Sequence, residues 1–488
     1  LECLHAAGET ISVASEYPLM YCNAYKDLES NTSALGICLP ATCSDDRTAV
    51  ISTFVYPMLC TRSRHLKQWY QRFGALFDFI SNKFLMATVF CSTVYHAVRG
   101  TKTKSLALQL FLAFSIIRNF QTITRPAKKH QKLITCIFGL RVIATLWVIV
   151  GHSTIFLQDF LVNVDEYRDS LKRNFFGQLV TNCFLSVEMF FLLSGILTSY
   201  GWFRTEPVTI RHWLQFYWHR VVRIWPAYAY VMFVVVLRYS VMHYHPVWQL
   251  DDQGAKCASN WWKNLLFINS ITDNNCMPWS WYIGTEFIFH LLSPVYLLSF
   301  NKSCALGMTL SILTIFSSTI LYVIKMCQYN FAPAQMLWVM PEIFNLDFME
   351  QHRVLYIKPQ YRISSYIIGL ALGYFLATIN QKSLSRSAIF CGWLLSALLG
   401  FSSLFGLYPA LQGWHWWSYH LCYAALHRIA WAIAIAWLIF VCHHGHAYYL
   451  NKILSFHLFV PLSASCYSVS LHIFKSTGKI TTEIIEKI

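Results

Sequence analysis

The chain has 488 residues, of which 56% are hydrophobic and only 12% are charged. Soluble domains carry about 25% charged residues, whereas the stretch Ala305–Ile324 has no charged residue at all. Apolar runs of this length are typical of membrane-spanning helices. The composition therefore predicts an all-α polytopic membrane protein and excludes a cytosolic enzyme, a secreted disulfide miniprotein and a disordered tail.

The formal net charge of +15 raises the question of nucleic-acid binding, but the distribution of the charges indicates a membrane topology instead. Residues 1–60 hold seven acidic and two basic residues, whereas residues 99–141 hold nine basic residues and no acidic one. Such asymmetry across a hydrophobic segment follows the positive-inside rule. We therefore place residues 1–60 outside the cytosol and the basic stretch in the cytosol, and we expect no nucleic-acid partner.

The N-terminal sixty residues form a cysteine-rich segment that is too polar to cross a membrane. An N-glycosylation sequon at Asn31 also suits an oxidising, extracytoplasmic side. Because no CxxC pair occurs, we favour disulfides over the alternative of a zinc site. Because the chain begins at Leu1 with no visible signal peptide, we expect an incomplete or processed N-terminus. The disulfide candidates here are Cys3, Cys22, Cys38, Cys43 and Cys60.

About ten hydrophobic segments have the length of membrane-spanning helices. They are expected near residues 76–98, 136–157, 177–200, 226–241, 281–300, 305–324, 363–379, 388–407, 422–442 and 454–474. Alternation of the spans places the loop 242–280 on the side of the N-terminal domain, where Cys257 and Cys276 are predicted to form a second disulfide site. The expected domains are a cysteine-rich extracytoplasmic domain (1–70), a first span (71–98), a basic linker (99–134), a membrane domain (135–475) and a polar tail (476–488).

Ionisable residues within hydrophobic segments are costly, so each is a functional hypothesis. Arg141 and His152 are eleven residues apart, which corresponds to three helical turns plus about 20°, and to about 16 Å of rise. Both side chains therefore share one helix face, which suits a cationic anchor near the cytosol and a general base deeper in the span. The alternative is an arginine that sets topology and a histidine that hydrogen-bonds between helices.

Three further groups carry candidate chemistry. Arg220 and Arg223 lie one turn apart and form a fork for phosphates, although most such pairs are ordinary positive-inside charge. Glu188 lies deep in an apolar segment, where it is either protonated or paired; it either orients an imidazole or forms a structural ion pair. Glu286 shares a helix face with His290 and forms either an acid/base pair or a contact between helices.

No metal site is expected from these residues. Two ligands such as Glu286 and His290 do not complete a site, and no third ligand is evident. The cluster His443-His444-Gly445-His446 resembles a metal-binding tract more closely, but at the edge of a membrane it is interpreted as surface.

Taken in order, these segments resemble the acyltransferase 3 family of membrane O-acyltransferases, and more closely its animal branch, the nose-resistant-to-fluoxetine-like proteins. The matching motifs are Gly36–Ser44, Gly139–Arg141 followed by Gly151-His152, Phe190–Gly195, Arg220 with Arg223, Trp281–Glu286, and Arg362 through Tyr366–Gly369. The chain departs from the family at Ile288, where glutamine is usual, and at Ile473-Phe474, which follow His472 where the family motif ends in His-Pro.

The resemblance implies an enzyme that moves an acyl group, other than an amino-acyl group, from a cytosolic acyl-CoA to a hydroxyl acceptor at or across the membrane. The residues implied are His152 as base or proton shuttle, Arg141, Arg220 and Arg223 as donor-binding groups, and Glu188 and Glu286 as positioning groups. Acyl-CoA would be a co-substrate, and no cofactor is expected. The alternative is a transporter of lipids or small molecules that performs no covalent chemistry. The expected location is the plasma membrane or an endomembrane, with the N-terminal domain extracytoplasmic.

Overall fold

A computed structural model describes residues 19–25, 34–40, 58–62, 73–100, 105–124, 133–158, 161, 163–205, 209–238, 253–272, 276–337, 339, 341–379 and 384–467. The chain divides into two compact units. The first comprises residues 1–114 and 230–261, and the second comprises residues 115–229 and 262–488.

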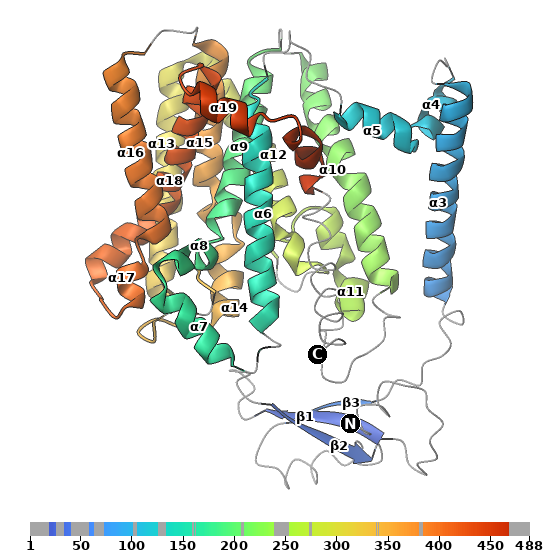
Figure 1. The fold of residues 1–488 in the computed structure, drawn as a ribbon, viewed down its shortest axis with the longest axis horizontal. Helices are drawn as coiled ribbons and strands as arrows, with labels where there is room; N and C mark the ends of the chain where they lie inside the picture. Colours follow the sequence, from blue (N-terminus) through green and yellow to red (C-terminus); the bar gives the residue numbers. More distant parts are fainter. Residues whose placement is uncertain are drawn as a thin grey trace. The chain divides into compact units, whose positions relative to one another are not determined.

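The first unit contains a small antiparallel sheet in the order β2-β1-β3 (Figure 1). Its strands are β1 (Leu19–Tyr25), β2 (Ala34–Pro40) and β3 (Met58–Arg62). The helices α3 (Phe73–Arg99) and α4 (Leu106–Leu112) follow, and the Ser92 hydroxyl of α3 donates to the Phe111 carbonyl of α4 at 2.8 Å. These strands lie in the N-terminal segment, which is predicted as a separate cysteine-rich domain beside the helical membrane domain.

The register of the sheet places one pair of the predicted disulfide cysteines opposite each other. Cys22 of β1 faces Cys60 of β3 in the pairing, whereas Cys38 of β2 is paired with Tyr21. Outside the described residues lie Cys3, Asn31 and Cys43. In the later loop, Cys257 and Cys276 are both disulfide-bonded.

The second unit is a bundle whose long helices run up and down roughly parallel to one another (Figure 1). In chain order its helices are α5 (Ile116–Thr124), α6 (Cys136–Leu157), α7 (Val164–Arg173), α8 (Gln178–Thr181), α9 (Leu185–Trp202), α12 (Trp281–Lys302), α13 (Cys304–Tyr329), α14 (Phe348–Gln351), α15 (Ile363–Thr378), α16 (Arg386–Phe405), α17 (Tyr408–Leu411), α18 (Trp417–His443) and α19 (Tyr448–Leu454). Two further helices, α10 (Ile210–Arg238) and α11 (Gln253–Leu265), contribute residues to both units.

Helices occupy each predicted span as far as residue 442, but a count of ten membrane-crossing helices is not confirmed. Among the described residues, six helices are long and apolar enough to cross a membrane, namely α6, α9, α12, α13, α16 and α18, or seven if α4 and α5 form one broken span. The helix α15 has only 16 residues. The last predicted span, 454–474, is helical at 459–467 and then passes outside the described residues.

Glycines bring α9 and α15 into direct backbone contact. A Cβ atom on Gly195 would collide with the Tyr366 carbonyl, and one on Gly369 would collide with the Leu192 carbonyl. Small residues permit this close approach between membrane helices. The contact places Glu188, one turn into α9, beside the start of α15, and it accounts for the glycines in two of the sequence motifs.

Candidate active site

Glu188 is the centre of an ion-pair network that joins α9, α15 and α18. Its carboxylate accepts from Arg362 Nη1 at 2.7 Å and from the Ser365 hydroxyl at 2.6 Å, and Arg428 Nε lies 3.6 Å away. Arg362 is itself only 1% exposed, and its guanidinium lies 3.7 Å from the centre of the Tyr356 ring. Within the described ranges the hydrogen-bond and ion-pair partners of Glu188 are therefore two arginines and a serine, and no imidazole is among them.

A second network joins α9, α10 and α12. Arg220 forms an ion pair with Glu286, and the Ser194 hydroxyl donates to the same carboxylate while it accepts from Arg220 Nη2 at 2.8 Å. The charge of Arg220, predicted to bind the donor, is thus balanced by a carboxylate. His290, predicted as the neighbour of Glu286 on the helix face, stacks on Phe216 with 4.1 Å between ring centres.

Arg141 and Arg223 differ from the other two arginine sites because no carboxylate among the described residues balances them. They come from α6 and α10, and they interact electrostatically with each other and with Arg220. In the part of the chain that the structure describes, neither forms an ion pair. Like charges held close together repel, and a pair of guanidinium forks matches the geometry of phosphate oxygens. The pair is therefore suited to an anionic ligand.

The ring hydrogen of His152 can be assigned from its neighbour. Its Nδ1 lies 2.9 Å from the Val148 carbonyl oxygen, one turn earlier on α6. A carbonyl oxygen only accepts, so we assign the ring hydrogen to Nδ1, and Nε2 is then the basic nitrogen of the neutral ring. The position of His152 on α6, three turns beyond Arg141, agrees with the predicted helix, which has the same bounds.

The structure adds His352, which the sequence analysis did not single out. It opens a π-helical turn, His352–Tyr356, in the connection between α13 and α15, outside the candidate spans. Its charge would interact with those of His152 and Arg362. Such turns occur frequently at functional sites. No local pattern marks this histidine, because its proximity to His152 depends on two segments that lie 200 positions apart in the chain.

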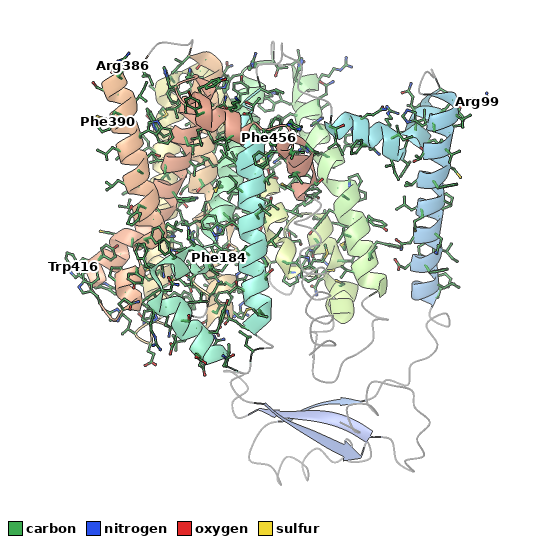
Figure 2. The ribbon with its side chains drawn as sticks, viewed as in Figure 1. Arg99, Phe184, Arg386, Phe390, Trp416 and Phe456 are labelled. Atoms are coloured by element: carbon green, nitrogen blue, oxygen red, sulfur yellow. The ribbon has the colours of Figure 1, made fainter. Side chains whose placement is uncertain are left out.

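Other contributors were also missed or were named only as motif residues. Phe184, labelled in Figure 2, packs its ring against Tyr356 with 5.0 Å between centres and also contacts the Phe348 ring. Tyr282 of α12 interacts electrostatically with groups of both networks and with the unbalanced pair, namely Arg220, Arg141 and Glu188. Ion pairs and electrostatic interactions thus link the predicted donor-binding arginines to Glu188, Glu286 and Tyr282, and His352 interacts with both His152 and Arg362.

No metal centre is visible in this group. Among the residues with described positions, no three histidine, cysteine, aspartate or glutamate side chains are placed to hold a metal ion.

These features define a multi-helix membrane protein with a buried arginine–glutamate–histidine centre. Residues 134–476 match the family model of an acyltransferase domain. The chain therefore belongs to the acyltransferase 3 family, and its similarity to a nematode relative supports the nose-resistant-to-fluoxetine-like branch.

That relative is "Nose resistant to fluoxetine protein 6" of Caenorhabditis elegans, 30% identical over 386 residues that cover 73% of this chain and 46% of the relative. "Regulator of hypoxia-inducible factor 1" of the same organism is 25% identical over 51% of this chain and 54% of its own length. "Peptidoglycan O-acetyltransferase OatA" of Listeria monocytogenes is 29% identical over 36% of this chain and 26% of its own length. The chain thus spans about half the length of the two nematode relatives or less. No solved structure matches the chain.

Proposed function

We propose that the chain is a membrane-bound O-acyltransferase that moves an acyl group from acyl-CoA to a hydroxyl acceptor at or across the membrane. The observation that carries this proposal is the pair of Arg141 and Arg223, which no carboxylate among the described residues balances, together with the position of Arg141 on the same helix as His152. A rise of about 16 Å along α6 separates Arg141 from His152. This arrangement suits a donor whose phosphates and reactive carbonyl are joined by a long arm. Membership of the acyltransferase 3 family and similarity to the Listeria peptidoglycan O-acetyltransferase add support.

The proposed reaction uses one base and one leaving group. His152 Nε2 removes the proton of the acceptor hydroxyl as its oxygen attacks the thioester carbon, while Nδ1–H stays on the Val148 carbonyl. A carbon–oxygen bond forms, the carbon–sulfur bond breaks, and the departing thiolate takes the proton from the His152 imidazolium. Arg141 and Arg223 hold the phosphates of the donor.

The two glutamates have a positioning role in this proposal. Glu286 fixes Arg220 through their ion pair, and Glu188 fixes Arg362 and Arg428. The two networks together hold three arginines, Arg220, Arg362 and Arg428, against two glutamates. Arg141 and Arg223 add two further positive charges, so positive charge remains in excess around the donor site. An excess of this sign favours an anionic substrate.

Acyl transfer by the full chain in lipid nanodiscs tests the proposal, with radiolabelled acetyl-CoA as the donor probe. We expect label to pass from CoA to a lipid or an added alcohol, and we expect His152→Ala to lower the rate by about 10²–10⁴-fold, the usual contribution of a general base. His457→Ala, which changes an exposed histidine beyond α19, is the matched control and should keep the wild-type rate. Absence of transfer by the wild type, or an equal rate for His152→Ala, refutes the proposal; movement of an intact substrate across the bilayer would then favour a transporter.

A further inference from the structure

The hydrogen of the His352 ring can be placed from its neighbours. Gln335 Nε2 lies 3.3 Å from His352 Nδ1 and 3.4 Å from the Phe348 carbonyl oxygen. Because that carbonyl only accepts, the Gln335 side chain presents its N–H groups on this side, and Nδ1 of His352 accepts one of them. The ring hydrogen therefore lies on Nε2, the opposite of the assignment for His152.

His352 also stays neutral under physiological conditions. Burial, reinforced by the positive charge of Arg362 and by His152, lowers the pKa of His352 to about 3. The charge of Arg362 is itself held in place by Glu188. A neutral imidazole with its hydrogen on Nε2 is neither a cation nor a base at that nitrogen, but a hydrogen-bond donor.

The orientation of this donor is fixed by aromatic packing. The His352 ring stacks on Tyr356 at 4.8 Å between centres, and the Trp281 ring is nearly perpendicular to it at 6.4 Å between centres. Within the described ranges His352 makes no hydrogen bond other than that with Gln335, so its Nε2–H has no acceptor in this part of the protein. A rigid donor without a protein partner near the catalytic base is what a site needs to stabilise charge that develops only during the reaction.

From these observations we propose that His352 is a second catalytic residue, which donates its Nε2–H to the carbonyl oxygen of the acyl donor while His152 acts as base. This role rests on the proposed acyl transfer. As the acceptor oxygen bonds to the carbonyl carbon, an electron pair moves onto the carbonyl oxygen, and the His352 hydrogen bond stabilises that oxyanion. The pair returns when the carbon–sulfur bond breaks. His352 transfers no proton, which agrees with its neutral state.

Two substitutions at one position test this role in the acetyl-CoA assay. His352→Phe keeps the ring packing but removes the donor, and we expect it to lower kcat by about 10²–10³-fold, the effect of losing one oxyanion donor, with KM for acetyl-CoA unchanged. His352→Gln places an amide N–H near the position of Nε2, and we expect it to recover at least part of that loss. His420→Phe is the matched control, because His420 is buried and its two ring nitrogens have no hydrogen-bond partner.

A second variant covers the case in which a change at His352 impairs folding. Gln335→Met removes the hydrogen bond that sets the tautomer but leaves the His352 ring in place, and it should also lower kcat without raising KM. A wild-type kcat for His352→Phe overturns the inference while transfer by the wild type leaves the proposed function standing. Equal losses for His352→Phe and His352→Gln, together with lower thermal stability in both, also overturn it and assign His352 a structural role. A wild type without acyl transfer refutes both proposals.

Discussion

Replacing Glu188 by glutamine should destabilise the helix bundle strongly, because two buried arginines would lose their counter-ion. At an effective dielectric constant of about 20, the gross Coulomb attraction across the 2.7 Å contact with Arg362 is about 6 kcal/mol. Arg428, at 3.6 Å, contributes a further attraction of the same order. Removing one partner of a buried ion pair typically costs about 3–5 kcal/mol after relaxation. We therefore expect Glu188→Gln to lower the free energy of unfolding by about 4 kcal/mol.

Denaturation of the full chain in mixed micelles measures this loss. Glu166→Gln, on the exposed face of α7, is the matched control and should change the free energy of unfolding by less than about 0.5 kcal/mol. The double variant Glu188→Gln with Arg362→Met should be more stable than the sum of the single losses predicts, because the two residues interact directly. A loss below about 1 kcal/mol for Glu188→Gln, or strict additivity in the double variant, would refute the ion-pair reasoning.

Three further outcomes follow from the structure. Arg141→Gln should raise KM for acetyl-CoA about tenfold or more, the value of one charge-assisted hydrogen bond. Because the change relieves repulsion between arginines, the ligand-free variant should be as stable as the wild type or more stable. Steady-state kinetics and thermal unfolding measure the two effects, and an unchanged KM would count against the phosphate site. Gly195→Ala should destabilise the protein by about 1–3 kcal/mol, because the added methyl group collides with α15. Gly201→Ala, on the same helix, meets no neighbour and should be neutral. Similar melting temperatures for the two variants would contradict the close contact between α9 and α15. Peptide mapping without reduction should recover Cys22 linked to Cys60, the pair that the strand register brings together, and a different partner for Cys22 would exclude that pairing.

Local patterns predicted the parts of the fold that depend on single segments. The apolar run from residue 136 to residue 157 predicted α6 with its observed bounds, and the eleven-residue spacing placed Arg141 and His152 on that helix. The small sheet was not expected, because strand pairing between separate short segments leaves a weak signal in one sequence.

Contacts between distant segments account for what could not be predicted. The spacing of Arg220 suggested a ligand for phosphate, but Glu286, on another helix, already balances its charge. Glu188 allowed either an ion pair or an interaction with an imidazole, and only the packing of α15 shows Arg362 beside it. His352 carried no local signal, since its relation to His152 arises from tertiary structure.

A structure of the full chain in nanodiscs, determined by electron cryomicroscopy with a non-transferable acyl-CoA analogue, tests the central claim most directly. We expect the phosphates of the analogue to contact Arg141 and Arg223, and its carbonyl carbon to lie within reach of an acceptor oxygen held by His152 Nε2. An analogue bound elsewhere, or bound to the arginines with its acyl end directed away from His152, would contradict the central claim.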